Sequence, residues 1–147
     1  MKKLFFLLLL LPSLFIGCNN NNPQGRVPVS GEITLDGKPL VQGNILFSSL
    51  PGLSPVVATG SPIKNGTFSL PAEQGLIPDQ EYLVQIRSVE EIPGTRKEAD
   101  NLMETTVETR DIIPSQYNDE SKETVKATKS YPNKFRFDLK SNQQNAE

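Results

Sequence analysis

The sequence contains no histidine and no tryptophan, and its only cysteine is Cys18. The absence of histidine removes the commonest general base and the commonest metal ligand of proteins. A single cysteine cannot form an internal disulfide, so the chain has no disulfide framework. No serine has a supporting motif and no phosphate-binding glycine loop is present. We therefore expect no enzyme activity and no catalytic, metal-binding or cofactor-binding residues.

The charge balance also excludes a class of partner. The 147 residues carry 15 Lys+Arg against 17 Asp+Glu, and the chain is close to neutral. Nucleic-acid-binding domains show a clustered basic surface, which this sequence lacks. The length gives room for one domain.

The first seventeen residues have the layout of a secretory signal peptide. Lys2 and Lys3 precede an apolar stretch that runs, interrupted by Pro12 and Ser13, to Gly17. This stretch is short of the ~20 residues that a membrane-spanning helix needs. A charged start, a short apolar region and a small final residue predict a cleaved signal over residues 1–17. The alternative is a membrane-spanning anchor, which the length and Pro12 disfavour.

The end of that signal resembles the bacterial lipobox, in the sequence Phe15-Ile16-Gly17-Cys18. Phe15 stands where the family usually has leucine. The resemblance implies that the Cys18 thiol receives a diacylglyceryl group, that a peptidase cuts before it, and that the new amino terminus is acylated. Several acyl chains hold a protein stably on a membrane, whereas one holds it marginally. The alternative is a free or buried cysteine in a cleaved protein.

Residues 18–25 read as a polar tether. Asn19 to Gly25 contain neither a charge nor a large apolar side chain. Seven extended residues reach roughly 25 Å, so the domain is expected close to the membrane. Removal of residues 1–17 leaves thirteen basic against seventeen acidic side chains, a net charge of −4. Attraction to anionic lipid is therefore not expected to strengthen the anchor.

Short segments within residues 26–139 alternate between apolar and polar side chains, which is typical of half-buried strands. Val27, Val29, Gly31, Ile33 and Leu35 alternate in this way, and so do four further groups: Ile45 with Phe47, Phe68 with Leu70, Tyr82 with Val84 and Ile86, and Phe135 with Phe137 and Leu139. Asp36-Gly37 and Asn65-Gly66 are strong turn signals. Short strands separated by turns predict an all-β sandwich or barrel. Residues 140–147 form a polar tail.

One long charged segment, Glu90 to Gln116, breaks this rhythm. Long connections are uncommon and often functional. We expect a surface loop that is docked at its ends and helical for a turn or two through Ala99, Leu102, Met103 and Thr106. Its carboxylates, together with nearby basic side chains, are interpreted as a solvated surface rather than a calcium or catalytic site. They are Glu90, Glu91, Glu98, Asp100, Glu104, Glu108 and Asp111.

The domain resembles the transthyretin-like, carboxypeptidase-regulatory-like lipoproteins of the planctomycete type. The resemblance is carried by "VSGEITLDGKPL", "NGTFSL", "EYLVQIRS", "IIPSQYN" and "KFRFDL". It implies a Greek-key β-sandwich of about seven strands, and it supplies no catalytic residues. Of the tyrosines, we expect Tyr82 to pack in the core and Tyr117 to fasten the end of the long loop.

These observations predict a lipid-anchored, extracytoplasmic protein of the cell envelope, on the periplasmic face or the outer membrane. Its sandwich domain is expected to be non-catalytic, with a binding or structural role. Its partners would be the membrane, through Cys18, and an envelope protein or a carbohydrate. The alternative function is a carrier or accessory module that presents a small molecule or carbohydrate.

Overall fold

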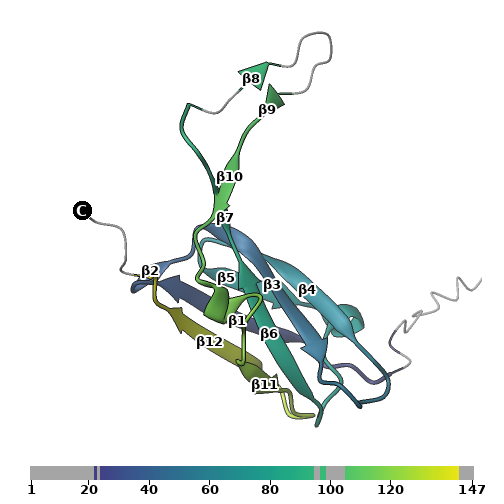
Figure 1. Cartoon of the computed structure of the whole chain (residues 1–147). Helices are drawn as coiled ribbons and strands as arrows, with labels where there is room; N and C mark the ends of the chain where they lie inside the picture. Colours follow the sequence, from purple (N-terminus) through teal and green to yellow (C-terminus); the bar gives the residue numbers. More distant parts are fainter. Residues whose placement is uncertain (1–21, 23, 95–96, 99–104, 143–147) are drawn as a thin grey trace, which may run out of the picture.

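Strands make up most of the fold, as the alternating pattern predicts (Figure 1). The computed structural model describes residues 22, 24–94, 97–98 and 105–142. Two short 3₁₀ helices, η1 (Ala72–Gln74) and η2 (Ser115–Tyr117), lie in loops. The strands of this described part are β1 (Val29–Leu35), β2 (Lys38–Pro39), β3 (Gln42–Ser49), β4 (Ala58–Lys64), β5 (Thr67–Leu70), β6 (Glu81–Arg87), β7 (Val89–Glu91), β8 (Lys97–Glu98), β9 (Thr105–Thr106), β10 (Thr109–Asp111), β11 (Thr124–Lys126) and β12 (Asn133–Leu139).

One curled sheet forms the body, in the order β11-β6-β3-β4-β5-β1-β12, with β2 also beside β1. The strands β3, β4 and β5 follow one another as neighbours, and β1 lies beside β5. This is a Greek-key order. The neighbouring strands pair antiparallel except β1 and β12, which run parallel from Val29↔Asn133 to Leu35↔Leu139. The seven strands of this path confirm the all-β prediction and its approximate strand number.

Both predicted Asx-Gly turns are present. Asp36 and Gly37 have φ values of 52° and 80°, and Asn65 and Gly66 have values of 49° and 76°. Two consecutive residues with positive φ form the turn that matches the right-handed twist of a hairpin, and asparagine, aspartate and glycine tolerate this conformation best. These turns connect β1 to β2 and β4 to β5.

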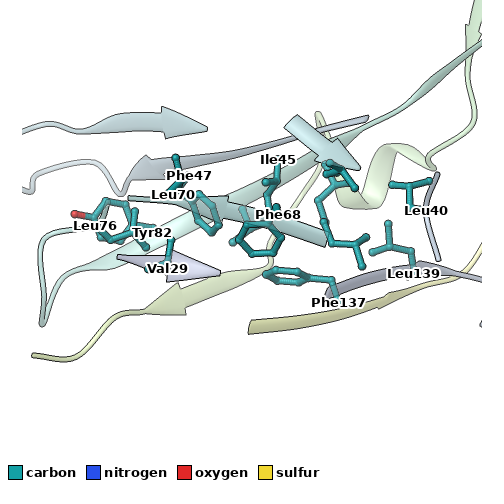
Figure 2. Packing of buried hydrophobic residues seen from close by; sticks show 14 of the residues in the cluster. Val29, Leu40, Ile45, Phe47, Phe68, Leu70, Leu76, Tyr82, Phe137 and Leu139 are labelled. Carbon is teal, nitrogen blue, oxygen red and sulfur yellow. The ribbon is translucent and has the colours of Figure 1, made fainter. Parts of the chain in front are cut away.

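The core lies between the facing halves of the curled sheet (Figure 2). The apolar residues predicted to share a face on β3, β5 and β6 are all buried, and Tyr82 is among them. The Phe68 ring lies between the rings of Phe47 and Phe137, with centroid separations of 5.8 and 6.3 Å. These three rings come from β3, β5 and β12, so they join strands that are far apart in the sheet order.

The last strand shows the predicted alternation, although its two phenylalanines differ. Phe137 is buried and Phe135 is only partly buried against the core. Gly31 lies opposite Phe135 on β1. A Cβ atom at Gly31 would collide with the Phe135 carbonyl oxygen and would lie 2.5 Å from the Phe68 ring, so glycine allows this close packing.

The chain enters the sandwich at one end and the long charged segment leaves it at the other (Figure 1). Val27 forms an antiparallel bridge with Leu76 just before β1 begins, and we call this the tether end. The last residue of β1, Leu35, lines the same surface as Val89 and Ile112, from which the charged segment projects. We call this the arm end, and residues 89–111 the arm.

The arm is a ribbon of short strand pairs, β7 with β10 and β8 with β9. The predicted helix is therefore wrong at Thr106, which lies in β9, while Ala99, Leu102 and Met103 lie outside the described residues. Thr105, Thr106 and Thr109 are β-branched, and such residues favour extended backbone over helix. No helix in the described part of the chain is long and apolar enough to cross a membrane.

Candidate functional site

The described part of the arm is stabilised by strand pairing and by the ion pair of Arg110 with Glu90. Arg110 lies opposite Glu90 in the β7–β10 register. The Arg110 guanidinium places its Nε and Nη2 atoms 2.5 Å from the Glu90 carboxylate, and both side chains are exposed. The Ile92 amide donates to the Glu108 carbonyl at 2.8 Å, which continues the pairing outward. These bonds give the ribbon a defined direction away from the sandwich.

A polar cluster fastens the base of the arm to β6, and we call it the clasp: Arg87, Asp111, Asn118 and Asp119. The Arg87 guanidinium pairs with Asp119 and lies 4.0 Å from the Asp111 carboxylate. Asn118 is buried, and its Nδ2 atom donates to Asp111 at 3.2 Å and to the Ile113 carbonyl at 3.1 Å. Asn118 therefore connects the strand that ends the arm to the segment that follows it.

The "IIPSQYN" sequence builds this attachment. Ile113 and Pro114 are buried, and η2 follows directly. Tyr117 packs against the core, and its hydroxyl accepts a hydrogen bond from the Lys140 amide at 3.2 Å. The predicted role of Tyr117 in fastening the end of the long segment is confirmed.

Two adjoining depressions lie at the base of the arm, with volumes of about 580 and 440 Å³. Val41, Gln42, Ser88 and Val89 line both, and we call this surface the basal groove. Val41 and Val89 are exposed there. Ser88 is buried and donates to the Gln42 carbonyl at 2.7 Å, so the wall between β3 and β7 is fixed.

Charged side chains of both signs border the basal groove. Lys64 lines one depression, and Lys38, Asp36 and Glu90 line the other. Arg87 also lines it, although its guanidinium is paired with Asp119 of the clasp. A partly apolar floor with a rim of both charges is a surface that can bind a ligand with apolar and polar parts, by contact rather than by covalent chemistry.

Two carboxylates near this region are stabilised in their charged form. Hydrogen bonds from Ser141 hold the pKa of Asp36 below its usual value. Hydrogen bonds from Arg136, and then from Thr34, lower the pKa of Asp138. The hydrogen bond between Arg136 and Asp138 in turn raises the pKa of Arg136. Each of these groups is exposed, so the shifts reflect local pairing on the surface.

The structure places the predicted carboxylates as follows. Glu90 pairs with Arg110, and Asp111 belongs to the clasp. Glu98 lies in β8, Glu91 and Glu108 are exposed on the ribbon, and Asp100 and Glu104 lie outside the described residues. Within the part of the chain that the structure describes, no group of three or more Asp, Glu, Cys or His side chains could hold a metal ion.

Cys18, the predicted lipidation site, also lies outside the described residues. The basal groove could not be predicted from the sequence, because Val41 and Val89 are far apart in the chain and only the folded structure brings them together. Val41 does have a local signal: it is an apolar residue shortly after the short strand β2 and directly before β3, where no alternation requires it to be buried.

Comparisons with protein-family models, with curated proteins and with solved structures find no match. The transthyretin-like resemblance therefore stays a prediction.

Proposed function

We propose that this protein is a lipoprotein of the cell envelope that presents its arm and basal groove to a partner at a distance from the membrane. The acyl chains on Cys18 would supply the anchor, and the domain would act by binding or as a structural component, without catalysis. The fold proposed for the domain is that of the transthyretin-like, carboxypeptidase-regulatory-like family.

The observation that carries this proposal is the position of the arm relative to the tether. The tether joins the sandwich at the Val27–Leu76 bridge, and the arm leaves from the opposite end of β1. Strand β1 has seven residues. A strand of this length spans roughly 20 Å, because each residue advances it by ~3.3 Å. A chain anchored through Cys18 would thus hold its arm farther from the lipid than its tether end by about the length of this strand.

The arm and the segment that follows it also have a charge that suits this orientation. Residues 88–123 contain ten acidic and four basic side chains. A segment of this charge is repelled by a lipid surface that carries anionic headgroups. The acidic segment therefore favours an orientation with the arm away from the membrane.

The anchor is tested by metabolic labelling of the full chain with a fatty acid. The expected result is incorporation into the wild-type protein, with the protein in the membrane fraction. The Cys18→Ala variant should incorporate no label and should leave the membrane fraction or remain unprocessed. A wild-type protein without label would refute the lipoprotein proposal.

A second function is favoured by one observation, the volume of the basal groove. Its larger depression, which is open to solvent, has a volume of about 580 Å³. Sites for small molecules have volumes of roughly 300–1000 Å³, so the groove is large enough for one. The domain would then be a carrier or accessory module that presents a small molecule or a carbohydrate. The test measures binding of the domain to a panel of sugars. The indole of a Val41→Trp variant should fill the groove and abolish binding of any sugar that the wild type binds. A variant at the distant, exposed Tyr131 should leave binding unchanged.

A further inference from the structure

The loop that connects β3 to β4, residues 50–57, carries the most exposed large apolar side chain of the described residues. Val56 is 83% exposed. Leu50 and Leu53 are partly buried, and no charged side chain occurs between Lys38 and Lys64. Because the loop carries no charge, it can lie against an apolar surface without the cost of removing a charge from water.

The loop is held in this exposed form by its base. The Ser49 amide donates to the Val57 carbonyl at 2.8 Å, and the Val57 amide donates to the Ser49 hydroxyl at 2.9 Å. Val57 itself is buried in the core. Val56 is therefore fixed between a closed base and solvent and cannot turn inward without breaking these bonds.

A second exposed large side chain lies at the same end of the sandwich. Tyr131 is 76% exposed, on the loop between β11 and β12. Asn133 closes this loop, because its side chain accepts from the Thr128 amide at 2.8 Å and donates to the Thr128 carbonyl at 3.0 Å. Asn133 also lies opposite Val29 at the start of β1, which places the loop at the tether end.

These two loops surround the point where the tether joins the domain (Figure 1). The bridge partner of Val27, Leu76, belongs to the loop between β5 and β6. That loop contacts the start of β4, since Thr59 donates to the Gln74 carbonyl at 2.6 Å. The β3–β4, β5–β6 and β11–β12 loops are thus neighbours at the tether end.

The charges at this end differ from those at the arm end. The tether-end loops, residues 24–28, 50–57, 71–80 and 127–132, carry Arg26 and Lys129 against Glu73 and Asp79, and are neutral as a group. The arm and the segment that follows it, residues 88–123, are acidic. A lipid surface would therefore meet a neutral, partly apolar face at one end of the molecule and a repelled face at the other.

We propose that the tether end is a lipid-contact face, in which Val56 enters the boundary between headgroups and acyl chains and Tyr131 lies at headgroup level. The inference rests on the proposed anchor at Cys18, because a tether of seven residues keeps this end within roughly 25 Å of the bilayer. Tyrosine is enriched at membrane interfaces, where its ring is apolar and its hydroxyl is wet. Interfacial segments of this kind bind through buried apolar area, and the anchor raises their local concentration at the surface.

The test uses the full lipidated chain in vesicles of neutral and anionic phospholipid. Acylation of Cys18 removes the only native thiol, so a cysteine introduced at residue 56 can be labelled alone with an environment-sensitive fluorophore. The matched control is Val41→Cys, since Val41 is also an exposed valine, 71% exposed, but lies at the arm end. Emission is measured with a quencher carried on the lipid and with iodide in the water.

The label in the Val56→Cys chain should shift to the blue and be quenched by the lipid-borne group, whereas the label in the Val41→Cys chain should be quenched by iodide. In unlabelled chains, Val56→Asp should reduce spontaneous transfer onto vesicles about tenfold relative to Val41→Asp, which matches the burial of one valine side chain. Iodide quenching of both labels in membrane-bound protein would overturn this inference alone. Shielding from both quenchers would indicate a protein contact and would also overturn it. Labelling of wild-type protein at Cys18 would instead overturn the anchor, and this inference with it.

Discussion

Truncation of Phe137 to alanine is expected to remove a large part of the stability of the domain. Phe137 is 5% exposed and its ring packs on Phe68, which packs in turn on Phe47. The truncation removes the favourable transfer free energy of the ring and leaves a cavity beside Phe68. The strands β1 and β12 cannot close this cavity, because their pairing fixes the distance between them. Such substitutions cost about 3–5 kcal/mol. The total for a domain is about 5–15 kcal/mol.

Phe135→Ala is the matched control on the same strand. Phe135 is partly buried, so it loses less contact, and we expect about half the cost, roughly 1.5–2.5 kcal/mol. The assay is urea unfolding of residues 22–147, followed by far-UV circular dichroism, with the free energy of unfolding extrapolated to water. Equal costs for the two variants, or a cost below ~1 kcal/mol for Phe137→Ala, would refute the assignment of Phe137 to the centre of the core.

Three further predictions concern single contacts. Gly31→Ala drives a Cβ atom into a carbonyl oxygen of β12. The strain should lower the free energy of unfolding by about 1–3 kcal/mol, and an unchanged urea midpoint would contradict this close contact. Tyr82→Phe removes the acceptor of the Ile77 amide at 3.0 Å. It should cost about 1–3 kcal/mol, because a partly buried amide is left without a partner, and a cost near zero would mean that water replaces the hydroxyl. The pKa of Asp138 is lowered by Arg136 from the ordinary carboxyl value of 3.8. The stabilisation that accompanies a lowered pKa is present above that ordinary value and is lost as pH falls through the folded pKa. Urea midpoints of Asp138→Asn, measured from pH 7 to pH 2, should therefore fall less steeply below pH 4 than those of the wild type, and parallel curves would argue against the shift.

The strand pattern was predictable because it is local. Ile45 with Phe47, and Phe68 with Leu70, alternate at the period of a strand, and the Asn65-Gly66 turn needs only its own two residues. The helix that was wrongly predicted through Thr106 lies where the sequence shows no such alternation. The strands β8 and β9 have two residues each, too short for any period to show, and the arm depends on cross-strand pairing that single residues do not encode.

The location of the candidate site could be predicted from the sequence, but the residues that form its groove and its clasp could not. The charged composition of residues 90–116 marked the arm as the place outside the core. The basal groove, however, is formed where the start of β3 meets the start of β7, and this meeting is a property of sheet order rather than of sequence pattern. The clasp likewise joins Arg87 to Asp119 across more than thirty positions of the chain. The sequence supplies its residue types, and only the fold supplies their distances.

The parallel pairing of β1 with β12 has a consequence for biogenesis. The first long strand and the last are joined over seven residue pairs, and the hydroxyl of Thr34 donates to Asp138 across 104 positions. Contacts this distant in sequence form late, because the loop between them must close first. The sheet therefore lacks one edge until the last strand has been synthesised, and the growing chain cannot complete its fold on the ribosome. A chain of this design keeps an unpaired β1 edge for as long as its last strand is still being made.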